Sequence, residues 1–155
     1  MPFVIDHVIE IDAPASVVWE VITDLRAYGE WNPFVVGCRS TLGVGAPIAM
    51  QVRVFPWFAQ PQTETVLDHI PGEKLCYGVE GGAVGAIVSR RCHELQPLGR
   101  ERSRYQSHFE LSGWMGGVVR LLLGGRLRHG FEAMSFAIQR RAEDLRARRE
   151  PESRA

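Results

Sequence analysis

The chain has 155 residues, 45% of them hydrophobic, and its 18 basic and 18 acidic side chains balance to a formal net charge of +0. That length suits one domain able to bury a core without metals or disulfides. The balanced charge argues against a nucleic-acid partner, and no apolar run approaches the roughly 18 residues that a membrane-spanning helix needs.

The cysteines give no sign of a disulfide framework or a metal site. Cys38, Cys76 and Cys92 are odd in number, lack metal-ligand spacing and follow no N-terminal signal sequence. This pattern favours three free thiols in a reducing cytoplasm. The glycine-rich stretch 81–85 does not match a phosphate-binding loop. We therefore expect a cytoplasmic protein with no metal and no cofactor.

The N-terminal segment carries one strand signal followed by helix signals. Apolar residues and His7 occupy alternate positions of Phe3–Ile11, which predicts a strand with one buried face. A helix-starting proline follows, and apolar residues at three- and four-residue steps predict a short helix over Pro14–Leu25. Tyr28–Phe34 is predicted as a tight turn or a second short helix.

From residue 35 to residue 112 the chain reads as six strands separated by glycine and proline turns. The predicted strands are Val35–Leu42, Ile48–Val54, Gln62–Ile70, Lys74–Val79, Ile87–Leu95 and Ser103–Leu111. Their hairpin spacing implies antiparallel pairing. An aromatic turn, Trp57–Phe58, interrupts the second hairpin.

From Trp114 the chain is predicted to be helical, with one sustained apolar stripe. The stripe consists of Leu123, Leu127, Phe131, Met134, Ile138, Ala142 and Leu145. Five glycines between residues 116 and 130 either widen the space beneath this helix or simply start and bend it. Residues 1–148 are predicted as a single domain and residues 149–155 as a frayed, charged tail.

These elements predict an α+β fold in which a seven-stranded antiparallel sheet curls around the final helix. One helix covers only one face of such a sheet, so the sheet must curve and the short helices must close an end. The apolar stripe is too narrow to fill the resulting trough. A cavity for a small molecule is therefore expected.

Several segments resemble the polyketide cyclase/dehydrase-like branch of the START-related, birch-pollen-allergen-like (SRPBCC) superfamily. The segments are Ile9–Trp19, Thr23–Asp24, Tyr28–Phe34, Ile70–Leu75, His93–Pro97 and Phe109–Gly113. The resemblance covers nearly the whole chain and implies a helix-grip fold with a deep ligand cavity. It does not fix a reaction, because the superfamily includes enzymes, lipid carriers and receptors.

The expected ligand-binding side chains are mostly aromatic or aliphatic. They are Trp31, Phe34, Met50, Trp57, Tyr77, Phe109, Leu123, Leu127 and Phe131. The alternative is that these are ordinary core residues, as aromatic residues in small domains often are. Exposed paired aromatics at the Trp57–Phe58 turn favour a cavity lid, a membrane contact or a homodimer contact.

Four polar residues are further candidates. Arg91 and His93 share one strand face, and Tyr105 and Ser107 share the face of Phe109, which the resemblance implies is inward. A neutral imidazole there orients a ligand or transfers protons, and a buried arginine requires an anionic partner. The alternatives are a core histidine bonded to its surroundings and an arginine that reaches the surface.

The sequence thus predicts binding or transport of a small hydrophobic ligand such as a lipid, polyketide or isoprenoid-like compound. The first alternative is a cyclase or dehydratase that uses Arg91, His93 and Tyr105, although no complete catalytic motif is present. The second alternative is a protein-interaction module that uses the aromatic turn and the arginine-rich helix. Whether the chain is an enzyme is left open.

Overall fold

A single antiparallel sheet of seven strands forms the body of the molecule. The computed structural model describes residues 2–81 and 85–154, and side chains up to residue 150. The strands are β1 (Phe3–Ile11), β2 (Val35–Arg39), β3 (Pro47–Phe55), β4 (Phe58–Ile70), β5 (Lys74–Val79), β6 (Val88–Pro97) and β7 (Ser103–Ser112). Their spatial order is β1-β7-β6-β5-β4-β3-β2, so the last six form a meander and β1 pairs with β7. All seven predicted strands are confirmed.

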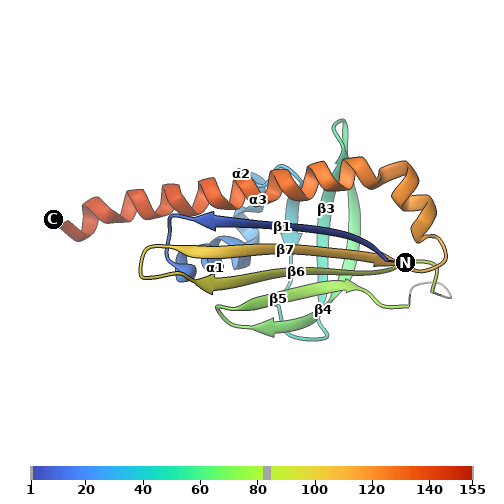
Figure 1. Cartoon of the computed structure of the whole chain (residues 1–155), viewed down its shortest axis with the longest axis horizontal. Helices are drawn as coiled ribbons and strands as arrows, with labels where there is room; N and C mark the ends of the chain where they lie inside the picture. The colour runs from blue at the N-terminus through green and yellow to red at the C-terminus, as the bar shows by residue number, and fades with distance from the viewer. Residues whose placement is uncertain (1, 82–84, 155) are drawn as a thin grey trace.

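The helices lie where the hydrophobic periodicity places them. They are α1 (Ala15–Thr23), the 3-10 turn η1 (Leu25–Ala27), α2 (Tyr28–Trp31) and α3 (Gly116–Arg154). Figure 1 shows α3 running the length of the sheet, with β3 and β4 turned steeply away from the direction of β1 and β7. The sheet is therefore strongly curled around α3, which confirms the predicted helix-grip architecture.

Strand alternation explains which face of the sheet holds the core. On β7, Ser103, Tyr105, Ser107, Phe109 and Leu111 are all buried, whereas the residues between them are half-buried or exposed. Such a period-2 pattern places one face of the strand against the helix. The predicted stripe of α3 meets this face, with Leu127, Phe131, Met134, Ile138 and Ala142 buried. The two patterns together form a continuous core.

The glycines of α3 have two different roles. A Cβ on Gly130 would lie 2.3 Å from the Phe34 ring, and one on Gly124 would lie 3.4 Å from Phe3. These two glycines let an aromatic ring approach the helix backbone closely. A Cβ on Gly125 would meet nothing within 4 Å. Helix α3 bends close to its N-terminal end (Figure 1), and a Gly124–Gly125 pair favours such a bend.

The prediction of three free thiols is wrong, because Cys76 and Cys92 form a disulfide. The antiparallel register of β5 and β6 places these two residues directly opposite each other, with Cα atoms 4.2 Å apart. Cys38 is free and buried, and burial raises the pKa of its thiol to about 12. The cytoplasmic location that rested on free thiols stays a prediction.

Two further sequence predictions concern the ends of elements. The tail from residue 149, expected to be frayed, continues α3 as far as Arg154. Residues 82–84 of the glycine-rich stretch and residue 155 of the tail lie outside the described part of the chain. No helix among the described residues is long and apolar enough to cross a bilayer.

Candidate functional site

A cavity of about 510 Å³ lies between the curled sheet and the N-terminal half of α3. Its walls come from the segments on both sides of the trough. The lining residues are Phe34, Val35, Met50, Val52, Val54, Gln60, Gln62, Glu64, Tyr77, Val79, Ala86, Ile87, Ser89, Arg91, Phe109, Leu111, Val119, Leu123, Leu127 and Phe131. Most of these side chains are apolar. The proposition that the helical stripe leaves the trough partly empty is therefore confirmed.

The cavity occupies one end of the trough, and core side chains fill the other. Strand β6 contributes Arg91 to the lining but not His93, and α3 contributes Phe131 but not Met134. His93 and Met134 are fully buried among the core residues that face α1. The boundary between the cavity and the solid core therefore runs through Arg91 and Phe131.

Three aromatic rings form the floor of the cavity at this boundary. The Phe131 ring lies 4.6 Å from the Phe109 ring and 5.0 Å from the Phe34 ring, measured between centroids. Phe34 is positioned by Asn32, whose side-chain oxygen accepts hydrogen bonds from the backbone N–H groups of Phe34 and Val35. The floor is thus a rigid apolar surface of the kind that holds hydrophobic or planar ligands.

The mouth of the cavity lies near the start of α3. The lining residues that are only half-buried or exposed mark it: Val54, Gln60, Gln62, Val79, Ala86, Ile87, Val119 and Leu123. They come from the ends of β3, β4 and β5, the segment before β6, and the first turns of α3. A ligand would therefore enter beside the N-terminal part of this helix.

Arg91 is a buried cation at the floor of this apolar cavity. Only 3% of its surface is exposed, and its guanidinium lies 4.7 Å from the centre of the Phe131 ring. The groups that accept its hydrogen bonds are neutral: the Ser107 hydroxyl, the Cys92 carbonyl, the Tyr105 hydroxyl and the Met134 sulfur. Its Nε–H is buried without a partner in the described structure. A buried charge without an opposite charge is unfavourable, so the site favours an anionic guest.

A chain of hydrogen bonds connects Arg91 to the cavity wall through the core. Tyr105 accepts from Arg91 at 3.4 Å and lies 2.7 Å from His93 Nδ1, while His93 Nε2 lies 3.1 Å from the Tyr77 hydroxyl. If Tyr105 donates to Nδ1 and Nε2–H donates to Tyr77, the Tyr105 hydroxyl proton and the imidazole proton both have acceptors within the described residues. This assignment leaves the Tyr77 hydroxyl proton unused at the cavity wall.

Burial keeps the network around His93 neutral. Desolvation lowers the pKa of His93 well below its ordinary value, and the nearby positive charge of Arg91 lowers it further. Desolvation also raises the pKa of Tyr77. His93 is fully enclosed and is connected to the cavity-lining residues through Tyr77 and, by way of Tyr105, through Arg91. The imidazole therefore acts as a neutral link that orients Tyr77 and Tyr105.

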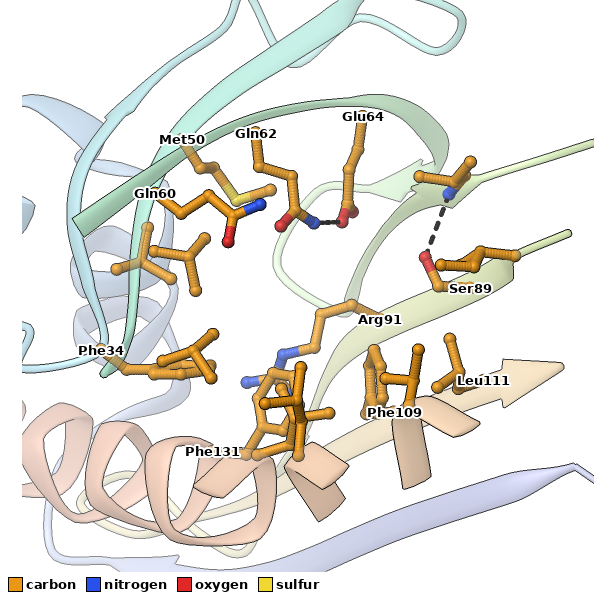
Figure 2. Close-up of a pocket in the computed structure, with 18 of the residues that line it drawn as sticks. Phe34, Met50, Gln60, Gln62, Glu64, Ser89, Arg91, Phe109, Leu111 and Phe131 are labelled. Carbon is orange, nitrogen blue, oxygen red and sulfur yellow. Dashed lines mark hydrogen bonds between the residues drawn. The ribbon is translucent and has the colours of Figure 1, made fainter. Parts of the chain in front are cut away.

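The wall opposite Arg91 carries three polar side chains from one face of β4. Figure 2 shows Gln60, Gln62 and Glu64 on this wall, with Arg91 and Phe131 across the cavity from them. The Gln62 side-chain amide donates to Glu64. Desolvation raises the pKa of the Glu64 carboxyl, and the hydrogen bond from Gln62 and the positive charge of Arg91 partly oppose this rise. Glu64 forms no ion pair with Arg91 among the described contacts.

The structure brings most of the predicted site residues to the cavity but not all of them. Phe34, Met50, Tyr77, Arg91, Phe109, Leu123, Leu127 and Phe131 line it. His93, Tyr105 and Ser107 lie directly behind the wall, in the network that holds Arg91 and Tyr77.

Two predicted tryptophans lie elsewhere. Trp31 packs on Tyr28 and borders a small hollow beside Arg141. Trp57 is exposed at the β3–β4 hairpin, as its position in a turn predicted. Neither contributes to the cavity lining. The polar face formed by Gln60, Gln62 and Glu64 was missed, because alternate polar residues on a strand are equally typical of a face in contact with solvent.

The comparison with protein families settles the relationship that the sequence suggested. The family model described as "Polyketide cyclase / dehydrase and lipid transport" matches residues 2–149. The chain belongs to this family. No curated protein sequence matches the chain.

Solved structures of similar proteins share the fold at low sequence identity. A START superfamily protein from Mycobacterium smegmatis is 19% identical, with a TM-score of 0.69 over 92% of this chain and 98% of that one. The Zhui aromatase/cyclase from Streptomyces sp. R1128 is 20% identical, with a TM-score of 0.69 over 96% of each chain. A point mutant of norcoclaurine synthase from Thalictrum flavum is 18% identical, with a TM-score of 0.68 over 94% of this chain and 97% of that one. These structural neighbours share the helix-grip fold.

Proposed function

We propose that this protein binds a small, mainly apolar molecule that carries one anionic or strongly accepting oxygen group. The observation that carries this proposal is the 510 Å³ apolar cavity with the buried guanidinium of Arg91 at its floor, which forms no ion pair among the described contacts. Cavities of about 300–1,000 Å³ are typical of sites for small organic ligands. The family description, which names lipid transport, supports the same class of ligand.

The polar groups at the floor define the chemistry of the ligand's oxygen group. Arg91 Nε–H is buried without an acceptor within the described residues. When His93 Nε2–H donates to Tyr77, the Tyr77 hydroxyl proton is free to donate into the cavity. These two residues face each other across β5 and β6. Two unused donors on paired residues favour a carboxylate, an enolate or a carbonyl oxygen. The apolar remainder of the ligand would then extend over Phe131 toward the mouth.

The proposal is tested by titrating delipidated protein with a dansyl-labelled undecanoic acid and following probe fluorescence. We expect saturable, single-site binding that a long-chain fatty acid displaces more strongly than the corresponding alcohol. Leu123→Trp places a large ring inside the cavity and should abolish binding. Leu122→Trp, at the neighbouring exposed position, is the matched control and should bind normally.

Equal binding by these two variants would show that the probe binds outside the cavity and would refute the proposal. Circular dichroism of both variants establishes that each is folded. Loss of binding in Leu123→Trp counts as support only when that variant unfolds as cooperatively as the control.

A cyclase or dehydratase activity is the second candidate, and one observation favours it. The Tyr77–His93–Tyr105 chain joins the cavity wall to Arg91, so Tyr77 is placed to exchange a proton while Arg91 polarises a carbonyl. The similarity to an aromatase/cyclase agrees with this candidate. Turnover of a linear polyketide mimic by the native protein, lost in Tyr77→Phe, would support it. A cytoplasmic location and a homodimer through the aromatic hairpin stay predictions.

A further inference from the structure

The N-terminal part of α3 exposes an apolar stripe that faces away from the sheet. Val118, Leu121 and Leu122 are 51%, 84% and 70% exposed, and the two leucines lie three and four residues after Val118. That spacing places them on one face of the helix. The opposite face carries Leu123 and Leu127, which contact the cavity. A helix in a globular protein normally buries its apolar stripe, so a second, solvent-facing stripe indicates a binding surface.

The same segment is purely cationic. Between Glu110 and Glu132 the sequence contains Arg120, Arg126 and Arg128 but no aspartate or glutamate. Among the described contacts, none of these arginines forms an ion pair, and each lies over an aromatic ring instead. At 100° per residue, Arg126 and Arg128 fall on either side of the exposed stripe. The surface thus combines an apolar centre with positively charged flanks.

The β3–β4 hairpin extends this surface. The Arg126 guanidinium lies 4.9 Å from the Phe55 ring and 5.7 Å from the Trp57 ring, which places the hairpin tip beside α3. Figure 1 shows the hairpin projecting past the helix. Trp57 is 74% exposed, and Trp114, just before α3, is 72% exposed. Tryptophans at the edge of an apolar, cationic surface are typical of proteins that lie at a membrane interface.

We propose that this surface, formed by Val118, Leu121, Leu122, Arg126, Arg128 and the Trp57 hairpin tip, docks on an anionic lipid bilayer. Apolar side chains would enter the headgroup region while the arginines bind lipid phosphates, the two contributions that hold amphipathic helices on membranes. This inference goes beyond ligand binding and does not depend on it. It places the cavity mouth, which Val119 and Leu123 border, beside the bilayer.

A second copy of the chain fits this surface less well than an anionic bilayer does. A two-fold symmetric contact brings each surface against its own copy. The arginines of one copy would then approach those of the other, with no acidic residue between positions 110 and 132 to neutralise them. An anionic bilayer satisfies the apolar and the cationic parts of the surface together.

Vesicle flotation tests the proposal, with vesicles of phosphatidylcholine alone and of phosphatidylcholine with 30% phosphatidylglycerol. We expect the full chain to float with the anionic vesicles and far less with the neutral ones, and added salt to weaken binding. Leu121→Ser with Leu122→Ser should lower the partition coefficient on the order of 100-fold, about tenfold for each buried leucine. Arg126→Gln with Arg128→Gln should lower it roughly 25-fold, about fivefold per charge.

Matched controls lie on other parts of the surface. Val44→Ser removes an equally exposed apolar residue from the β2–β3 connection, where Val44 is 66% exposed. Arg140→Gln removes an exposed arginine from the C-terminal half of α3. Both should float like the unmodified chain. The docking variants should retain the ligand probe's affinity in solution, because Leu121, Leu122, Arg126 and Arg128 do not line the cavity.

Three outcomes would overturn the proposal. The first is a full chain that stays in the unbound fraction with anionic vesicles, and the second is docking variants that float as well as the controls. The third outcome is a dimer in light scattering that Leu121→Ser with Leu122→Ser dissociates, which would assign the surface to a second copy. Because ligand binding is measured separately without vesicles, failure of membrane docking is distinguishable from failure of the proposed function.

Discussion

Replacing Arg91 with methionine tests whether this arginine stabilises the fold or instead serves to bind a ligand. Methionine has a similar length and no charge. The charge-assisted hydrogen bond to Ser107 contributes about 1.5–3 kcal/mol, and its loss lowers the free energy of unfolding. Removal of a buried charge without an opposite charge acts in the other direction, by several kcal/mol. We therefore expect Arg91→Met to unfold at the same or a higher denaturant concentration than the unmodified chain.

The same substitution should weaken binding of an acidic ligand. One charge-assisted hydrogen bond between Arg91 and a carboxylate is worth about 1.5–3 kcal/mol, which corresponds to roughly a 10- to 150-fold rise in Kd. The affinity for the matching alcohol should change much less. Urea unfolding and probe displacement measure the two effects. Arg90→Met is the control, because Arg90 lies on the opposite face of β6 and outside the cavity lining.

Two results would contradict this reasoning. A loss of more than about 3 kcal/mol in Arg91→Met would show that the guanidinium stabilises the fold, as a partner of a satisfied buried network does. Unchanged discrimination between the acid and the alcohol would show that the ligand's oxygen group does not meet Arg91.

The remaining predictions concern pH, the disulfide and a helix glycine. The pKa of Glu64 is raised in the folded state, so the folded protein holds this proton more tightly than the unfolded chain. The free energy of unfolding should therefore fall as pH rises above the ordinary value of 4.5. Urea unfolding at several pH values should show this decline in the unmodified chain and not in Glu64→Gln. Reducing agent should lower the free energy of unfolding by about 3 kcal/mol, the chain-entropy value for a loop of this length, and a variant with alanine at Cys76 and Cys92 should not respond. Gly130→Ala should destabilise by about 1–3 kcal/mol through overpacking, whereas Gly125→Ala should stabilise by about 1 kcal/mol in thermal melts.

Local patterns predicted the fold well because the sheet and α3 each present one buried face. The alternation of β7 and the stripe from Leu123 to Leu145 were readable without coordinates, and both meet in the core. The shared parity of Arg91 and His93 indicated one common strand face but left open whether it points inward, and the structure buries both residues. The position of a residue in the strand alternation shows which face of the sheet it occupies, but not how far along the trough it lies. That is why His93 was expected in the cavity and lies behind Tyr77 instead.

The features that the sequence did not reveal depend on how distant segments of the chain pair and pack against one another. The Cys76–Cys92 bridge follows from the antiparallel pairing of β5 and β6, and 16 residues of separation alone do not indicate it. Trp31 was expected near the cavity because the family resemblance implies that its turn lies at one end of the cavity, but the Trp31 ring packs against Tyr28 instead. The polar wall at Gln62 and Glu64 resembles a solvated strand face in sequence. Only the curl of the sheet brings it to the cavity.

A crystal structure of the protein with a bound long-chain carboxylic acid tests the central claim most directly. The account predicts one molecule between α3 and the β3–β4 wall, with its carboxylate within hydrogen-bonding distance of Arg91 Nε and its chain over the Phe131 ring. A ligand bound elsewhere, or a trough closed by its own side chains with Arg91 paired to Glu64, would contradict it.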